Sequence, residues 1–347
     1  MLSCSLAFSQ EADDDTVTGV GFSLIPRLDI SPAFPLRSVK DLTLGNTSLY
    51  SLFEGSFLDE SLTFSICNHW LSTSPADLYI YEDEEGNFRP NFFYTDTNNW
   101  LDWAYLSYSV AGFEIQAGKS YLLTGGFAFD ADDYDLHPVL ESSLWNNFSP
   151  YQWGVTVGYT LPSENHSFAF QFATSPYGTR PFVSKLFSYS LEWRGTFGDY
   201  STRLTATALQ TDCKEYIPLL SWGNRYDFDH GHVGLDLYNC VVNNTDYETS
   251  VWGIAAMPEV FYDVTPRLEI FAKGGFEYDF NAEDRQPGWF GGLGLHWYPL
   301  QDRSLRLHLL AAYNDNPYSP LLNWDGEQRK FTISFGALYY LNFGILK

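Results

Sequence analysis

The chain has 347 residues, of which 18% are aromatic, and 43 acidic residues against 19 lysines and arginines give a formal net charge of -24. Such an excess of negative charge excludes nucleic acid as an expected partner, because the phosphates would be repelled. No run of about 18 apolar residues occurs, so the sequence contains no candidate transmembrane helix. Aromatic and aliphatic residues are nevertheless too frequent for a disordered acidic chain.

The first residues are typical of the end of a signal peptide. Ala7-Phe8-Ser9 fits a small-x-small cleavage site after a short apolar stretch, although the positively charged start is missing. We therefore predict a signal peptide remnant over 1–9 and an acidic tail over 10–15. A poor lipobox at Leu2-Ser3-Cys4 is the alternative.

Alternation with a period of two dominates the rest of the chain. In residues 150–161, apolar side chains at every second position alternate with glycine, threonine and glutamine, and 166–174, 184–195 and 329–343 repeat the pattern. This period belongs to a β-strand with two different faces. Several such segments reach ten residues, which is enough to cross a bilayer at a tilt.

Aromatic residues gather near the ends of these segments, as at Trp100, Trp153 and Trp289. Transmembrane barrels place aromatic girdles at both membrane interfaces. A chain that enters lipid without an apolar helix must close into a barrel, because only then is every backbone polar group paired. We therefore predict an all-β fold with one transmembrane antiparallel β-barrel over 16–347. A soluble sandwich with an aromatic core is the alternative.

Short and long connections alternate along the chain, as in outer-membrane barrels with tight periplasmic turns and long external loops. Counting from both ends predicts about sixteen strands, with fourteen as the alternative. The least regular of them spans 216–223, because Pro218 interrupts it. The predicted strands are 16–30, 47–57, 60–71, 99–110, 113–122, 150–161, 166–174, 184–195, 200–210, 216–223, 231–241, 249–262, 267–279, 288–298, 303–314 and 329–343.

Several segments together resemble bacterial outer-membrane porins of the Bacteroidetes type and, more distantly, the phosphate-selective porin family. These segments are Leu101-Asp102-Trp103-Ala104-Tyr105, Ala117-Gly118-Lys119-Ser120, the acidic stretch 130–135, Ser143-Leu-Trp-Asn-Asn147, Ser175-Pro-Tyr-Gly178 and Ser190-Leu-Glu-Trp-Arg194. The resemblance implies a passive diffusion pore in the outer membrane. Phosphate-selective porins line their pores with many lysines and arginines, whereas this chain has only 19, so we expect a general or cation-leaning pore.

The face opposite the apolar positions should line the interior of the barrel. Charges of both signs on such a wall set ion preference, whereas pairing across strands would only stiffen the wall. Lys119 falls on the outward face, and we expect it to reach the membrane interface or to follow a bulge. The predicted pore-lining residues are Glu114, Gln116, Glu192, Arg194, Arg203, Asp236, Glu259, Glu269, Lys273, Glu277, Arg306 and His308.

The long loop over 123–149 is the candidate constriction, because the corresponding loop of the resembling porins folds into the lumen. Its carboxylates Asp130, Asp132, Asp133 and Asp135 would attract cations. A solvated loop outside the barrel is the alternative. A calcium site is a further alternative, although the spacing lacks the glycine and the terminal glutamate of an EF-hand.

Catalytic and metal motifs are weak in this sequence. His230 and His232 are the only close histidine pair, and no HExxH, CxxC or glycine-rich phosphate loop occurs. An outer-membrane lipid-acting enzyme would need a serine near Asn68-His69, and no serine there has a convincing spacing. We therefore predict no enzyme, no metal site and no cofactor. Cys67, Cys213 and Cys240 are expected to be incidental packing residues.

Three hypotheses for the function remain: a diffusion pore, a non-conducting structural or receptor barrel, and a lipid-acting enzyme. Leu338 and Tyr340, both expected to point inward, mildly favour a packed interior. The expected partners are outer-membrane lipid and lipopolysaccharide together with small hydrophilic solutes or ions, and a homotrimer is one assembly consistent with the resemblance. The acidic runs at 13–15 and 82–85 are expected to be exposed.

Overall fold

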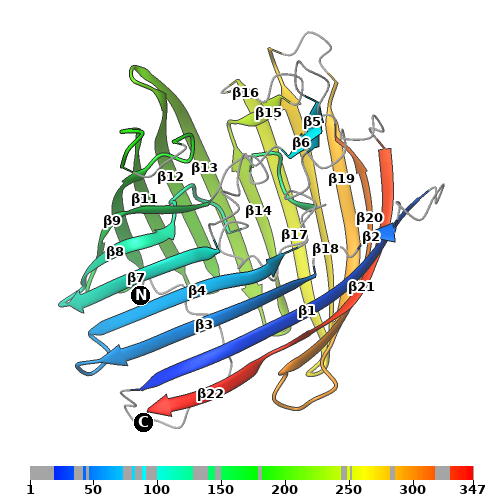
Figure 1. Ribbon diagram of the computed structural model, residues 1–347, viewed down its shortest axis with the longest axis horizontal. Helices are drawn as coiled ribbons and strands as arrows, with labels where there is room; N and C mark the ends of the chain where they lie inside the picture. Colours follow the sequence, from blue (N-terminus) through cyan, green and yellow to red (C-terminus); the bar gives the residue numbers. More distant parts are fainter. Residues whose placement is uncertain are drawn as a thin grey trace.

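The computed structural model describes residues 19–34, 42–43, 47–72, 80–82, 88–90, 100–127, 140–144, 150–178, 182–243, 248–250, 252–281, 286–316 and 329–346. It is a closed antiparallel β-barrel of 16 strands, in agreement with the prediction (Figure 1). The predicted residues 1–9 and 10–15 lie outside the described part of the chain. No helix in the described ranges is long and apolar enough to cross a membrane.

Each barrel strand corresponds to one of the predicted segments, and the last of them is broken into β21 and β22. The strands are β1 (Val20–Phe34), β3 (Ser48–Phe57), β4 (Leu62–Ser72), β7 (Leu101–Val110), β8 (Phe113–Tyr121), β9 (Tyr151–Thr160), β10 (His166–Thr174), β11 (Phe187–Phe197), β12 (Tyr200–Asp212), β13 (Glu215–Phe228), β14 (Gly231–Tyr238), β17 (Gly253–Thr265), β18 (Leu268–Asp279), β19 (Gly288–Trp297), β20 (Leu305–Asp315), β21 (Arg329–Tyr339) and β22 (Leu341–Leu346).

Short strands complete the described structure. β2 (Leu42–Thr43) extends the pairing of β1. β5 (Ile80–Glu82) pairs with β6 (Phe88–Pro90), and β15 (Val241–Asn243) pairs with β16 (Glu248–Ser250), as two hairpins outside the barrel sheet. Figure 1 shows both hairpins close to one end of the barrel.

The first and last strands close the barrel. β1 pairs with β3 along one edge and with β21 and β22 along the other. The break in the last strand lies between the pairs Arg27↔Leu338 and Leu24↔Leu341. Pro26 of β1 lies opposite this break, and proline has no amide hydrogen to donate to the ladder. On the other edge of the last strand the ladder with β20 continues through the break, where the amide of Tyr340 donates to the carbonyl oxygen of Ser304 at 2.8 Å.

The strand that Pro218 was expected to interrupt is intact. β13 pairs with β12 through Pro218 itself, whereas its pairing with β14 begins only at Ser221. Pro218 therefore lies in a stretch with a ladder on one side only, where a missing amide hydrogen is tolerated.

The connections divide the barrel into two ends. At the "turn end" the strands are joined by 58–61, 111–112, 161–165, 198–199, 229–230, 266–267 and 298–304. At the "loop end" most connections are longer, and the exception is the two-residue connection 213–214 between β12 and β13. Short and long connections thus alternate along the chain as predicted, with 213–214 as the exception.

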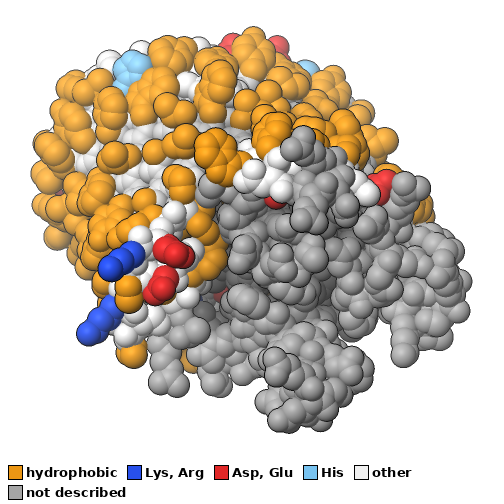
Figure 2. Space-filling view, turned by 90° about the horizontal axis from the view of Figure 1, so that it is seen from above, with side chains coloured by type: hydrophobic (Ala, Val, Ile, Leu, Met, Phe, Trp, Pro, Cys, Tyr) orange, Lys and Arg blue, Asp and Glu red, His pale blue; other side chains and the backbone are white. Residues whose placement is uncertain are grey.

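The two faces of the barrel differ as the period of two predicts. Large apolar side chains on alternate positions are exposed on the outer face, for example Leu191, Leu204 and Leu293. The intervening positions are buried or half-buried, as are Ser190 and Thr205. Figure 2 shows one side of this outer wall, where hydrophobic side chains cover most of the described surface. An outer surface of this kind is stable only against hydrocarbon.

A charge placed on the outer wall should therefore be costly. Leu191 lies near the middle of β11 and is 62% exposed, so Leu191→Arg is expected to lower the stability of the folded barrel in a bilayer by about 2–4 kcal/mol. Urea unfolding in phospholipid vesicles measures this change. The control is Gln116→Arg on the inner, half-buried face of β8, which is expected to have a small effect. Equal losses for both variants would contradict the assignment of the faces.

Candidate functional site in the barrel interior

The structure places the twelve predicted pore-lining residues on the face of the strands opposite the exposed apolar side chains. Glu114 and Gln116 alternate with the exposed Phe113 and Ile115 on β8. The charged members are not equally accessible. Those with at most 5% of their surface exposed are Glu192, Arg203, Asp236, Glu277, Arg306 and His308.

One group of these residues lies on β11 and β12. The Nε of Arg194 donates to Oε1 of Glu192 at 2.5 Å, and the Nε of Arg203 lies 3.8 Å from Oε2 of the same carboxylate. Thr205 also donates to Glu192, at 3.1 Å. Glu192 is thus neutralised by two arginines on the inner wall.

A second group spans β14, β17 and β18. Oε1 of Glu259 lies 3.6 Å from Nε2 of His232, and Oε2 lies 4.0 Å from Nζ of Lys273. Further along β14, Asp236 and Tyr238 occupy two consecutive inner positions, and the hydroxyl of Tyr238 donates to Oδ2 of Asp236 at 3.1 Å. This sector of the wall carries more carboxylates than cations.

A third group joins β1 to β20 across the intervening strand β21. Nε2 of His308 contacts Oδ1 of Asp29, and the Nε of Arg27 donates to Oδ2 of Asp29 at 2.8 Å. Gly336 of β21 lies between Asp29 and His308, and a Cβ there would fall 2.1 Å from Oδ1 of Asp29. The glycine therefore leaves the space in which the two side chains meet.

Arg27 and Asp29 were not among the predicted residues. Both occupy alternate positions of β1, so the same parity rule that identified Arg306 and His308 on β20 would have included them. A remaining predicted residue, Glu269, accepts from Nδ1 of His296 at 2.7 Å near the turn end.

The loop between β8 and β9 begins by running along the inner wall. The amide of Leu123 donates to Oε1 of Gln171 at 2.8 Å, and its carbonyl accepts from Thr207 at 2.5 Å. The carbonyl of Gly126 then accepts from Nη1 of Arg203 at 2.8 Å. Gln171, Thr207 and Arg203 all point inward, so residues 122–127 lie inside the barrel.

Phe127 and Gly223 complete this contact. The guanidinium of Arg203 lies 4.9 Å from the centre of the Phe127 ring, a cation–π distance. Gly223 of β13 gives the loop room to approach the wall, because a Cβ there would lie 2.9 Å from Cα of Gly126. The first part of the loop thus crosses the inner faces of β10, β12 and β13.

The returning part of the same loop is bound to the acidic sector of the wall. Nζ of Lys273 lies 2.9 Å from Oε1 of Glu141, and only 10% and 3% of the two side chains are exposed. The amide and the hydroxyl of Ser143 donate to Oε1 of Glu277 at 2.8 and 2.9 Å, while Asn316 donates to the other oxygen. Figure 1 shows the described parts of this segment within the ring of strands.

Apolar side chains also hold the loop to the wall. Leu122, Leu140 and Leu144 pack in one cluster with inward-facing residues, among them Phe290 and Leu310. A second inner cluster contains Ile25, Tyr50, Leu52, Cys67, Trp103, Tyr151 and Leu338. The interior is therefore partly filled by large side chains. The inward position predicted for Leu338 agrees with its complete burial.

The candidate constriction is only partly described. Asp130, Asp132, Asp133 and Asp135 lie outside the described residues, as do most residues of the acidic run 82–85. The expectation that these aspartates narrow the pore remains a prediction. Among the described residues, no group of three histidine, cysteine or acidic side chains could hold a metal ion.

The expectations for two single residues were only partly met. Lys119 does not reach the membrane interface, because its side chain is buried and its ammonium donates to the carbonyl of Leu101. The alternative expectation, an irregular strand, agrees with Gly118 beside it, whose φ of 135° lies outside the ordinary strand region. Cys213 is exposed in the connection 213–214, so it is not a packing residue.

The other two cysteines in the described part of the chain are buried thiols. Cys67 belongs to one inner apolar cluster and Cys240 to the other. Burial raises the pKa of the Cys240 thiol to about 12, so this side chain stays neutral. Both behave as small apolar residues.

No family model matches the chain, and a search of curated proteins found no relative. Solved structures do resemble it. The outer-membrane protein OmpT of Vibrio cholerae aligns with 95% of this chain and 99% of its own, at 12% identity and a TM-score of 0.58. A variant of the Rhodobacter blastica porin aligns with 93% of this chain and 100% of its own, at 12% identity and a TM-score of 0.58.

These likenesses, at 12% identity, confirm the predicted fold: the chain is a closed antiparallel β-barrel of the kind found in outer-membrane proteins. They do not test the Bacteroidetes type or the likeness to phosphate-selective porins.

The bond between Lys273 and Glu141 should hold the returning loop to the wall. Lys273→Met leaves a buried carboxylate without its cation, which is expected to destabilise the docked loop by about 3–5 kcal/mol. Protease cleavage within 128–139 of the folded protein should then become faster. In the double variant Lys273→Met/Glu141→Gln, part of the loss should be recovered.

The control is the half-exposed pair of Arg225 and Asp227, in which Nη2 lies 2.8 Å from Oδ1. Arg225→Gln is expected to change stability by less than about 1 kcal/mol. If Lys273→Met were as mild as Arg225→Gln, the ion pair would not be what holds the loop.

Proposed function

We propose that this chain is a passive diffusion pore for small hydrophilic solutes, with a preference for cations or little preference. The observation that carries the proposal is a polar, charged inner wall against which the loop after β8 is folded at both of its described ends. A loop held against one part of the wall narrows the lumen and leaves a passage beside it. No catalytic role is part of this proposal.

The charges of the wall favour cations. Across the described inner residues of β14, β17 and β18, the carboxylates of Asp236, Glu259, Glu269, Glu277 and Asp279 face only one lysine, Lys273. A wall rich in carboxylates concentrates cations and repels anions. Phosphate selectivity is not proposed, because 43 acidic residues outnumber the 19 basic ones in the whole chain.

We further propose an orientation for the barrel in the bacterial outer membrane. The turn end faces the periplasm and the loop end faces outward. The outer wall contacts lipid and lipopolysaccharide, and residues 1–9 are the remnant of a signal peptide. One neighbour, OmpT of Vibrio cholerae, has been solved in a trimer form. A homotrimer of this chain is proposed on that likeness.

A non-conducting structural or receptor barrel is the second candidate. The two inner apolar clusters favour it, because they place buried Leu140, Leu144, Trp103 and Leu338 inside the barrel. Such side chains displace water from part of the lumen. The two candidates differ in whether a continuous water path remains between the loop and the wall.

Planar-bilayer recording with the purified full chain separates the two candidates. The pore predicts stepwise conductance and, in a KCl gradient, a reversal potential whose sign indicates cation preference. Absence of conductance from correctly folded protein would favour the structural barrel. A preference for anions would contradict the proposal that carboxylates of the wall and the loop attract cations into the lumen.

The four loop aspartates provide the sharper test of selectivity. Replacement of Asp130, Asp132, Asp133 and Asp135 by asparagine is expected to lower the ratio of potassium to chloride permeability by roughly two- to tenfold. The matched control replaces Glu82, Asp83, Glu84 and Glu85 by their amides, which should leave the ratio nearly unchanged. An unchanged ratio in the aspartate variant would place these carboxylates outside the ion path.

The exposed Cys213 reports which end of the barrel faces outward. A membrane-impermeant maleimide is expected to label it on intact cells, because the connection 213–214 lies at the loop end. Cys213→Ser should lose the label. In that background Asp199→Cys, at the exposed turn 198–199, should react only after permeabilisation. The proposed orientation would be reversed if intact cells labelled the Asp199→Cys variant and left the wild type unlabelled.

A further inference from the structure

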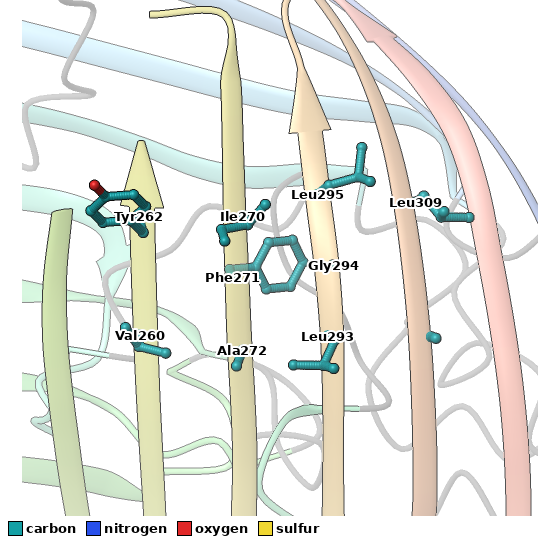
Figure 3. A pocket seen from close by; sticks show the side chains of 10 residues that line it. Val260, Tyr262, Ile270, Phe271, Ala272, Leu293, Gly294, Leu295 and Leu309 are labelled. Atoms are coloured by element: carbon teal, nitrogen blue, oxygen red, sulfur yellow. The ribbon is translucent and has the colours of Figure 1, made fainter. Parts of the chain in front are cut away.

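The outer wall has an apolar groove over β17, β18, β19 and β20, with a volume of about 390 Å³. This size falls within the range of ordinary small-molecule sites. Its walls are the outward side chains Val260, Tyr262, Ile270, Leu293, Leu295 and Leu309, and its floor lies at Ala272, Gly294 and Ala311 (Figure 3).

The register explains the depth of the groove. In one row across the strands, Tyr262, Ile270, Leu295 and Leu309 are adjacent and all large. In the row below, towards the loop end, large Val260 and Leu293 alternate with small Ala272 and Ala311. Figure 3 shows the two rows, with the Phe271 ring beside Gly294. The groove is therefore a row of gaps between rigid side chains.

The turn end of the same strands carries a cation. Arg267, in the turn 266–267, is exposed, and no ion pair of its side chain occurs among the residues that the structure describes. It lies three to five residues from Ile270 and Ala272, a distance of about 10–17 Å along the strand. Arginine is well suited to bind phosphate.

An anion lies in the adjoining turn. The amide of Tyr298 donates to the carbonyl of Arg267 at 2.8 Å, so the connection 298–304 starts beside Arg267. In that connection Asp302 is exposed and accepts from the amide and the hydroxyl of Ser304 at 3.2 and 2.9 Å. These hydrogen bonds lower the pKa of Asp302, so its carboxylate remains charged at neutral pH.

The other charges at this end of β17, β18 and the connection 298–304 pair with one another. Nη2 of Arg303 lies 3.9 Å from Oδ1 of Asp263 and 3.8 Å from Oε2 of Glu269, and its guanidinium lies 3.9 Å from the centre of the Tyr298 ring. Arg267 and Asp302 therefore remain as one exposed cation and one exposed anion above an apolar groove.

A second groove on the outer wall lacks this combination. It has a volume of about 490 Å³ and is lined by Phe113, Tyr159, Phe168, Leu191 and Leu204 among others. The turns at its end, 161–165 and 198–199, carry the exposed acids Glu164 and Asp199. Two carboxylates would repel a phosphate, so the first groove is the one that fits a lipid headgroup.

We propose that the groove over β17–β20 is a specific site for a phospholipid of the phosphatidylethanolamine class. One acyl chain occupies the groove between Val260 and Leu309, Arg267 binds the phosphate, and Asp302 accepts from the ammonium group. The exposed Trp297 at the same edge is suited to the polar boundary of the bilayer. This proposal depends on the barrel and its lipid-facing wall, and it does not depend on whether the lumen conducts.

Native mass spectrometry of the detergent-purified full chain, with phosphatidylethanolamine added, tests the proposal. The wild type is expected to retain one lipid molecule. Arg267→Gln and Ala272→Phe should each lower its occupancy roughly tenfold, because one removes a charged hydrogen bond and the other fills the groove. Phosphatidylglycerol, which has no ammonium group, should be retained less than phosphatidylethanolamine.

Matched variants control for general effects on the wall. Ala206→Phe fills the second groove, and Lys214→Gln removes an exposed cation at the loop end, and both should retain lipid as the wild type does. A phosphatidylethanolamine with a photoreactive acyl chain should label peptides within 260–311. Circular dichroism and heat resistance confirm that each variant is folded.

Three results would overturn the proposal. Retention by Arg267→Gln and Ala272→Phe equal to the wild type would exclude the groove. Equal retention of phosphatidylglycerol would exclude the role of Asp302. A change of oligomeric mass in Ala272→Phe without loss of lipid would mean that the groove seats a second copy of this chain.

Discussion

Closure of the sheet between β1 and the broken strand β21–β22 is the interaction on which the rest of the structure depends. Backbone groups in hydrocarbon have no water to bind, so every strand needs two neighbours. The barrel achieves this although Pro26 removes one donor at the seam, where the pairing of β1 passes from β22 to β21. Once the sheet is closed, one face of each strand must meet lipid and the other must meet an enclosed interior.

That enclosed interior explains how so many charges are buried in a membrane protein. The carboxylates of Glu192 and Asp29 are buried on the wall and that of Glu259 is half-buried, and each has a cationic or histidine partner. Glu277 is instead satisfied by Ser143 and Asn316, so the loop itself completes the wall. Because unpaired buried groups are expensive, the loop and the wall stabilise each other.

Much of the fold could be predicted from the sequence, because a strand with one lipid-facing side has a strict period of two. The period located the strands, including the irregular one through Pro218, and it placed Glu192 and Arg306 on the inner face. It failed at Lys119, where the unusual backbone of Gly118 breaks the parity. The path of the loop could not be predicted, because it depends on contacts such as that of Ser143 with Glu277, which are 134 residues apart. Arg27 and Asp29 were predictable in principle, whereas their link to His308 depends on Gly336 in a third strand.

The central claim is that the loop after β8 narrows a water-filled lumen rather than sealing it. Single-channel recording tests this most directly when the full chain is compared with a variant in which 128–139 is replaced by a short glycine-serine linker. We expect both proteins to conduct, with the larger conductance in the variant with the shorter loop. Silence from both folded proteins, or equal conductance, would contradict the account.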